Sequence, residues 1–326
     1  TTVLLLIANA GADWPEWRGP TANGVSPAKN TPVSWTTTEN VRWKYALPSG
    51  SGATPIVMAG KIYLTGIKAG ENVVFCLDLD GKLLWETPLG PATEGKHQKK
   101  GSGSHPSPTT DGERVYVYFR SGEFACLDTL GAILWRKNMQ ELYGRDTLYW
   151  DLGTSPALTK DYVLLATLHD PPSYVVAFKK ATGEVAWKIE RNLPAPRESH
   201  QSYSTPIVQV EDGVEKFYLL GSDHVTSHLV SNGEEIWRIG GFNPEQAINF
   251  RSIASPVVSD GMIVAPYARG RTLTGMRIDG KGDVTDTHVV WCDHDFGSDV
   301  PTPAAIDGKL YTVTDRGVFA CLDIRS

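Results

Sequence analysis

The sequence predicts an all-β protein made of a tandem repeat of about fifty residues. A small hydroxyl residue followed by proline recurs six times, and successive prolines are separated by 53, 48, 50, 50 and 47 residues. A tryptophan follows a turn later in each of five units, with separations of 50, 52, 50 and 54 residues. Two landmarks that stay in phase through five units indicate a repeat architecture. The landmarks are Thr54-Pro55, Ser107-Pro108, Ser155-Pro156, Thr205-Pro206, Ser255-Pro256 and Thr302-Pro303, with Trp85, Trp135, Trp187, Trp237 and Trp291.

Each unit is predicted to contain about four strands. Segments 61–65, 115–119 and 163–167 are rich in β-branched and aromatic residues and are bounded by Gly, Asp and Pro. No sustained helical period separates them. Most of the tryptophans follow a glycine turn, as in Asn232-Gly233, where glycine supplies the positive φ of a tight hairpin. We expect the tryptophans to fill the space between neighbouring sheets.

Repeated four-stranded units predict a β-propeller, with six units visible in the sequence. Segment 40–45 resembles an outer strand but precedes the first unit, whereas the last unit reaches Ser326 before its Gly and Trp. We therefore expect segment 40–45 to complete the last blade and close six blades. The alternative is a truncated chain whose whole propeller has seven or eight blades.

The composition indicates a globular protein that does not bind nucleic acid. The chain is 41% apolar and 21% charged, which is enough apolar content for a large core. Its formal charge is −6 and it has no long run of Lys or Arg, so neither nucleic acid nor an anionic membrane is expected as a partner. A monomer is expected.

The beginning of the chain predicts export. Residues 1–12 are apolar and then small, which is typical of the end of a secretory signal, with cleavage after Ala12. A buried first strand is the alternative. Asp13, rather than a cysteine, follows the cleavage point, which disfavours a lipid anchor, and no other apolar run is long enough to span a membrane. We expect a periplasmic or secreted protein with a signal remnant at 1–12, an N-terminal extension at 13–39 and a propeller at 40–326.

Three of the four cysteines occupy one repeat position. Cys76, Cys126 and Cys321 each precede Leu-Asp, which predicts buried packing residues rather than a disulfide framework. Cys292 stands elsewhere in its unit, and no two cysteines have metal or redox spacing.

The repeat motif resembles a known family. The pattern Ala/Cys-x-Asp-x-x-Gly-x-x-x-Trp, seen from Cys76 to Trp85 and from Cys126 to Trp135, resembles the tryptophan-docking motif of pyrroloquinoline-quinone-like (PQQ-like) repeat propellers. The third unit is one residue longer and has Lys179 where Asp is usual. The opening Asp-Trp-Pro-Glu-Trp-Arg-Gly-Pro at 13–20, followed by Asn-Gly-Val at 23–25, is similar to exported bacterial members of that family.

The resemblance implies the fold but not one activity. The family includes quinone-dependent alcohol and sugar dehydrogenases and non-enzymatic relatives, among them the propeller lipoprotein of the outer-membrane assembly machinery. The dehydrogenases typically use adjacent cysteines, a calcium ion and an Asp base, and this sequence has no adjacent cysteines and no recognisable calcium or base motif. We therefore expect no cofactor, with PQQ plus calcium as the alternative.

The residues favour a non-enzymatic binding or scaffold module of the bacterial cell envelope, whose partner is an envelope protein or a polar small ligand. The alternatives are a PQQ-dependent dehydrogenase-like enzyme and a polysaccharide-active protein that uses the central channel. Catalytic residues stay unknown, because the sequence lacks common hydrolase motifs and a site made of Ser104, His200 and Asp151 has no motif in its support.

A ligand site is predicted at the mouth of the central channel, where the segments before each proline landmark converge. The alternative is that these side chains bind turn backbones and channel water. Two histidine clusters, His224 with His228 and Asp293-His294-Asp295, are expected to be exposed loop residues rather than metal ligands. The ligand-binding candidates are His105, Tyr149, Trp150, Asp151, Glu198, His200, Gln201, Tyr203, Arg251 and Asp299.

Overall fold

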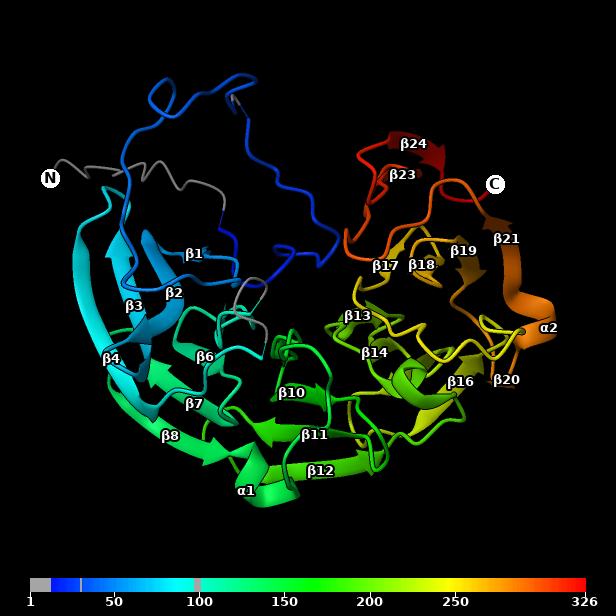
Figure 1. The fold of residues 1–326 in the computed structure, drawn as a ribbon, viewed down its shortest axis with the longest axis horizontal. Helices are drawn as coiled ribbons and strands as arrows, with labels where there is room; N and C mark the ends of the chain where they lie inside the picture. Colours follow the sequence, from blue (N-terminus) through cyan, green and yellow to red (C-terminus); the bar gives the residue numbers. More distant parts are fainter. Residues whose placement is uncertain (1–12, 30, 97–100) are drawn as a thin grey trace, which may run out of the picture.

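A computed structural model describes residues 13–29, 31–96 and 101–326, so the predicted signal remnant at 1–12 lies outside the described residues. Six sheets of the described residues follow one another around an arc, as Figure 1 shows, and all but one of their strand pairs are antiparallel. Within each sheet the strands pair in chain order, so each proline landmark leads into the innermost strand. The prediction of an all-β repeat protein with propeller-type blades is confirmed.

The first three sheets have four strands each. They are β1 (Ile56–Met58), β2 (Lys61–Lys68), β3 (Glu71–Asp78) and β4 (Leu83–Pro91); β5 (Thr109–Thr110), β6 (Arg114–Tyr118), β7 (Glu123–Asp128) and β8 (Ile133–Asn138); and β9 (Ala157–Leu158), β10 (Tyr162–Thr167), β11 (Tyr174–Lys179) and β12 (Val185–Glu190).

The last three sheets depart from four strands at two places. They are β13 (Ile207–Glu211), β14 (Val214–Gly221), β15 (His224–Leu229), β16 (Glu235–Ile239) and β20 (Gly282–Asp283); β17 (Val257–Ser259), β18 (Met262–Tyr267), β19 (Thr272–Arg277) and β21 (Val289–Asp293); and β22 (Ala304–Ile306), β23 (Lys309–Val313) and β24 (Phe319–Asp323). Short helical turns are α1 (Met139–Tyr143), η1 (Arg197–His200) and α2 (Thr285–His288). No helix among the described residues is both long and apolar enough to cross a membrane.

An insertion explains the longest tryptophan spacing. Strand β20 and helix α2 lie between β19 and β21, and β20 pairs in parallel with β16 of the preceding sheet. This inserted segment lengthens the interval from Trp237 to Trp291 without changing the meander of the fifth sheet.

The tryptophan motif joins each sheet to the next. The indole N–H of Trp85 donates to the Thr129 carbonyl oxygen at 3.2 Å, and its ring lies against Gly131, whose φ is +92°. A Cβ atom at Gly131 would lie 2.8 Å from that ring, so only glycine fits. The Asp128 carboxylate accepts the backbone N–H groups of residues 130 and 132 and so closes the same turn. The motif is therefore a contact between blades.

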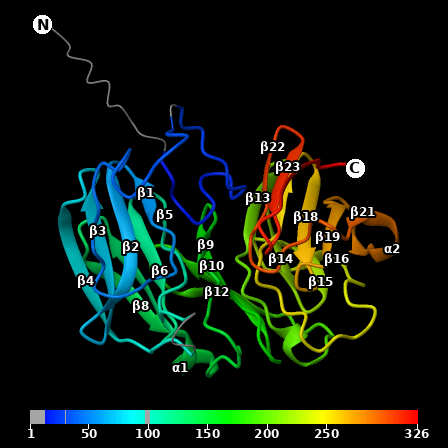
Figure 2. The ribbon, with the colours of Figure 1, turned by 45° about the horizontal axis from the view of Figure 1, so that its top comes forward.

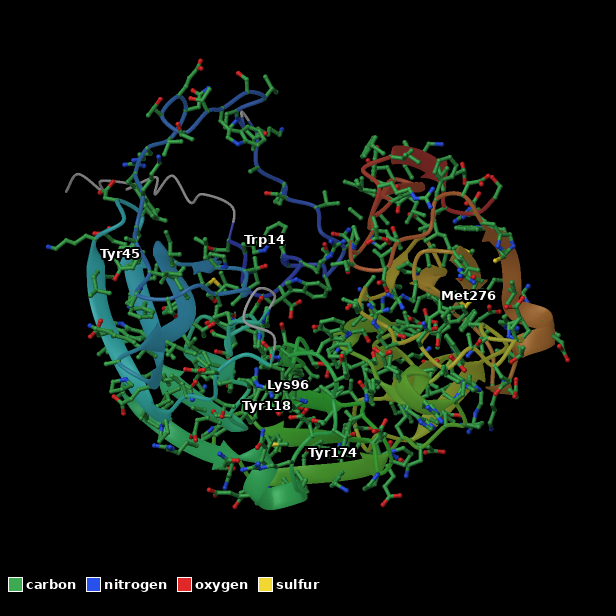
Figure 3. The ribbon with its side chains drawn as sticks, in the orientation of Figure 1. Trp14, Tyr45, Lys96, Tyr118, Tyr174 and Met276 are labelled. Atoms are coloured by element: carbon green, nitrogen blue, oxygen red, sulfur yellow. The ribbon has the colours of Figure 1, made fainter. Side chains whose placement is uncertain are left out.

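The same docking occurs before the first sheet, but the predicted closure of the last blade is wrong in the described residues. Trp43 donates to the Leu79 carbonyl oxygen at 2.8 Å and lies against Gly81, as an outer-strand tryptophan of a preceding blade would. However, segment 40–45 forms no strand, and the last sheet contains only β22, β23 and β24. Residues 41–47 instead pack on the first sheet, where Figure 3 labels Tyr45.

The missing fourth strand changes the environment of one predicted core residue. Cys76 and Cys126 are buried opposite Trp85 and Trp135, as expected. Cys321 is exposed, because no outer strand covers β24, so the prediction of a buried thiol is wrong at this position.

Candidate functional site

The hydroxyl residues of the proline landmarks form an open series of hydrogen bonds along the channel, which we call the hydroxyl arc. The backbone N–H of Ser107 donates to the Ser155 hydroxyl at 2.9 Å, and the N–H of Ser155 donates to the Thr205 hydroxyl at 3.0 Å. The same bond links Thr54 to Ser107, Thr205 to Ser255 and Ser255 to Thr302. Each inner strand is thus hydrogen-bonded to the inner strand of the next sheet. These bonds fix the positions of the loops that precede the inner strands.

These loops surround a cavity of about 570 Å³. A smaller cavity of about 180 Å³ adjoins it, since both are lined by His105, Gly153 and Tyr203, and it reaches Trp17 and the hydroxyl arc. We call the two together the central well. Its size is in the range of small-molecule sites.

The N-terminal segment crosses the inner end of the central well. Trp14 exchanges backbone hydrogen bonds with Val57 of β1, and the Thr110 N–H of β5 donates to the Pro15 carbonyl oxygen. Further along, the Asn23 side chain donates to the Ala305 carbonyl oxygen of β22 at 2.9 Å. Figure 2 shows this segment between the first and last sheets. Its residue Trp17 lines the smaller cavity of the well.

Asp151 forms the acidic side of the well. Its carboxylate pairs with the Arg120 guanidinium at 3.0 Å and accepts the Lys96 backbone N–H at 2.7 Å, and Figure 3 shows Lys96 on the inner side of the arc. The side chain is 5% exposed. A Cβ atom at Gly95 would lie 2.6 Å from its Oδ2, so glycine is required for this close approach. Within the described residues, Oδ2 has no hydrogen-bond donor.

His105 lies beside this carboxylate as a neutral ring. Its Nε2 is 3.6 Å from Asp151 Oδ2 and accepts the Ser102 backbone N–H at 3.0 Å, which assigns the ring proton to Nδ1. Burial lowers the pKa of His105, and the charge of Asp151 opposes this only in part. The 3.6 Å between Nε2 and Oδ2 is longer than a hydrogen bond, so His105 donates none to Asp151 in this arrangement.

Arg251 forms the basic side of the well. It pairs with Asp299 at 3.0 Å through Nη2 and with Glu198 at 3.4 Å through Nε, and its side chain is 6% exposed. Burial raises the pKa of Asp299, while Arg251 lowers it. The Nη1 group of Arg251 has no acceptor in the part of the chain that the structure describes. A buried guanidinium donor therefore lines the same cavity as the unpaired Asp151 oxygen.

The structure brings six of the ten predicted residues together in the well: His105, Trp150, Asp151, Tyr203, Arg251 and Asp299. The other four, Tyr149, Glu198, His200 and Gln201, line a separate depression of about 410 Å³. Ser104, His200 and Asp151 therefore do not form one site.

Gln201 binds turn backbone, which the sequence analysis gave as the alternative to ligand binding. Its side-chain oxygen accepts the Tyr149 backbone N–H at 2.8 Å and the Tyr203 hydroxyl at 3.1 Å. The Tyr203 hydroxyl in turn accepts the Trp150 backbone N–H at 3.0 Å, so this chain of bonds positions the well's aromatic wall.

Two arginines of the site were missed from the sequence. Arg120 and Arg269 lie at turns between the second and third strands of their sheets, whereas the prediction considered only the connections before the prolines. Both kinds of connection meet at the same end of the sheets in a meander. A charged residue directly after a buried second strand, such as Arg120 after β6 and Phe119, is the signal that was available.

The expectation of exposed histidines is wrong for His228. It lies within β15, stacks on Phe217 with ring centroids 4.8 Å apart, and bonds to Gly233 and Thr226. Burial lowers its pKa to about 4. Among the described residues, no group of three or more His, Cys, Asp or Glu side chains is placed to hold a metal ion.

Fold and site together define a β-propeller with tryptophan-docked blades and a ligand-sized central well. The chain belongs to the family described as outer membrane protein assembly factor BamB, whose profile matches residues 70–326. A comparison with curated protein sequences gave no match.

Several solved structures share the fold. BamB from Moraxella catarrhalis is 18% identical, with a TM-score of 0.57 over 86% of this chain and 72% of that one. Quinohemoprotein alcohol dehydrogenase from Comamonas testosteroni is 15% identical, with a TM-score of 0.62, and this chain spans 58% of it while 94% of this chain is covered. A europium-containing methanol dehydrogenase is 12% identical, with a TM-score of 0.63 over 94% of this chain and 68% of that one. At these identities the similarity is one of fold.

The residues of the well do not fit the quinone and metal of the dehydrogenases. Asp151 and Asp299 each lie 3.0 Å from an arginine, and a guanidinium in that position opposes a divalent cation. Cys76 and Cys126 are buried within blades, whereas Cys292 and Cys321 are exposed at other places, so none lines the well.

Proposed function

We propose that this chain is a non-enzymatic binding propeller of the bacterial cell envelope, and that it holds a small acid with hydroxyl groups in its central well. The location follows the family description and the export expected from the beginning of the sequence. The binding site follows from the chemistry of the well.

One observation carries the proposal: an unpaired donor and an unpaired acceptor, both buried, line one cavity. Arg251 Nη1 lacks an acceptor and Asp151 Oδ2 lacks a donor among the described residues. Each unpaired buried polar atom costs about 1–3 kcal/mol. A ligand carboxylate on Arg251 and a ligand hydroxyl on Asp151 would relieve both costs.

Binding is favoured over catalysis by the state of the ionisable groups. Both carboxylates of the well are paired with arginines, so neither is a free base. His105, which burial keeps neutral, uses its unprotonated nitrogen to accept the Ser102 N–H. The aromatic wall of Trp150 and the apolar Ile253 and Val300 suit the ring of a sugar acid.

Calorimetric titration with D-galacturonate tests the proposal. We expect saturable binding by the full chain, at least tenfold weaker binding of neutral D-galactose, and a loss of at least tenfold for Arg251→Gln. Arg42→Gln, which changes an exposed arginine, is the matched control and should bind as the original chain does. Binding of PQQ with calcium in place of galacturonate would contradict the proposal and favour the dehydrogenase-like alternative.

A second candidate function is protein docking on the outer rim. Leu84 and Leu134 precede the docking tryptophans of adjacent blades and are 46% and 47% exposed, and Leu130 between them is 77% exposed. Exposed apolar groups that gather on neighbouring strands are typical of interaction sites. Photo-crosslinking in the envelope from position 134 should capture one defined protein, whereas the exposed position 188 of β12 should not; equal capture from both positions would contradict docking at this rim.

A further inference from the structure

Beside the central well lies a second cavity, of about 460 Å³, which we call the arginine groove. It is lined by Arg269, Arg271, Arg316 and His294, together with Asp295 and Asp315. The first two arginines come from the turn between β18 and β19, and Arg316 comes from the turn between β23 and β24. The groove therefore lies across two neighbouring blades.

The three guanidinium groups of the groove have no carboxylate within 4.0 Å among the described residues. Elsewhere on the surface, Arg136 and Arg238 pair with Glu123 and Glu235 at 2.7 and 2.6 Å. The Arg271 guanidinium lies over the Phe250 ring, 5.5 Å from its centroid, and forms no ion pair with a carboxylate among the described residues. A cluster of unpaired arginines is a site for anionic groups.

Asp315 lines the groove but makes no ion pair with its arginines, because its carboxylate faces the backbone. It accepts the N–H groups of Asp299 and Val300 at 2.6 and 3.2 Å. This bond fixes the loop that carries Asp299 into the central well. The wall shared by the well and the groove is therefore held in place by a groove residue.

The floor of the groove is closely packed backbone. A Cβ atom at Gly297 would lie 2.7 Å from the Thr272 carbonyl oxygen and 2.8 Å from that of Gly270. Gly270 itself has a φ of +79°. Both positions need glycine, so the groove is a built feature of these turns rather than a gap between mobile side chains.

Arg269 lines both the groove and the well, so the two cavities are adjacent at this side chain. A ligand that occupies the well and extends past Arg269 meets Arg271 and Arg316 next. A repeating acid would place one carboxylate on Arg251 and the following ones on the groove. A single sugar acid would use only the well.

We infer that the ligand is an acidic oligosaccharide, a chain of uronic acids whose terminal sugar enters the central well while the next acidic sugars bind the arginine groove. The inference rests on the proposed function, because the terminal sugar is the acid assigned to the well. Beyond the proposed function, the inference specifies the length of the ligand and its direction across the surface.

The test compares galacturonate with trigalacturonate by calorimetry on the full chain at low salt. We expect the trimer to bind at least tenfold more tightly than the monomer, and the gain to shrink as salt is added. In the double variant Arg271→Gln/Arg316→Gln the gain should fall below threefold, while the affinity for the monomer stays within twofold. Arg277→Gln, an exposed arginine on β19, is the matched control and should retain the full gain.

The outcomes separate the two proposals. A monomer that binds with no gain for the trimer overturns the arginine groove and leaves the well intact. A similar gain for neutral maltotriose over maltose, or tripolyphosphate that binds as tightly as trigalacturonate, overturns the assignment to uronic acids. Failure of both monomer and trimer to bind overturns the proposed function itself.

Discussion

The indole N–H of Trp135 donates a 2.9 Å hydrogen bond to the Lys180 carbonyl oxygen of the next blade, and its ring lies on Gly183. This contact fixes the position of one sheet relative to its neighbour. It depends on a glycine with φ of +68°, where a Cβ atom would lie 2.6 Å from the ring.

Gly183→Ala should therefore lower the free energy of unfolding by about 2–4 kcal/mol, from backbone strain and from loss of the docked ring. Gly213→Ala is the matched control, because Gly213 has a similar φ of +79° but a Cβ atom there would meet no other atom within 4 Å. It should lose only about 1–2 kcal/mol. Equal losses in urea denaturation would show that the tryptophan contact does not stabilise the blades.

A second prediction concerns the hydroxyl arc. Ser155→Ala removes the acceptor of the buried Ser107 N–H and should lower the free energy of unfolding by about 1–3 kcal/mol. Ser26→Ala removes an equivalent hydroxyl acceptor at an exposed turn, where water replaces it, and should change stability by less than about 0.5 kcal/mol. If the two variants unfold at the same urea concentration, the hydrogen bond to the Ser155 hydroxyl does not stabilise the fold.

Glu16 in the N-terminal segment should make stability depend on pH. Burial raises its pKa to about 8, against about 4.5 when it is unperturbed, and a backbone hydrogen bond with Leu158 opposes the shift. The folded chain favours the protonated, neutral form of Glu16. The contribution of this side chain to the free energy of unfolding is therefore complete below pH 4.5 and is lost as the pH rises toward 8.

Glu16→Gln should consequently unfold at a higher temperature than the original chain at pH 8, and the difference should shrink toward pH 5. Glu39→Gln, at an exposed position, should follow the original chain at both values. Parallel melting curves for Glu16→Gln and the original chain across this range would refute the effect.

The cysteines should divide into two reactive classes. Burial raises the pKa of Cys76 to about 11 and that of Cys126 to about 12, whereas Cys292 and Cys321 are exposed. A thiol reagent at pH 8 should therefore label Cys292 and Cys321 in the folded chain, and all four thiols after denaturation. Mass spectrometry that finds Cys321 protected would indicate that something covers β24.

The repeat landmarks predicted the blades because packing between sheets requires the same residues once per unit. The sequence showed that a hydroxyl precedes each proline, but the hydrogen bonds of the hydroxyl arc depend on distances between units. Cys321 and segment 40–45 were predicted wrongly for one reason: both assumed that the last sheet has a fourth strand. His228 was misjudged because strand β15 extends to Leu229, beyond what the sequence pattern indicated.

Part of the site could also be predicted from the repeat landmarks. Asp151 and Arg251 each stand four residues before the hydroxyl residue of a proline landmark, where connections converge on the channel. Arg120 and Arg269 reach the well from turns that carry no such landmark, and the pairing of Asp151 with Arg120 follows only from the arrangement of the sheets.

The most direct test of the account is a crystal structure of the full chain with galacturonate. We predict a sugar acid in the central well, with its carboxylate within hydrogen-bond distance of Arg251 Nη1 and a hydroxyl on Asp151 Oδ2. A ligand bound only in the depression beside His200, or a central well filled with water at saturating galacturonate, would contradict the central claim.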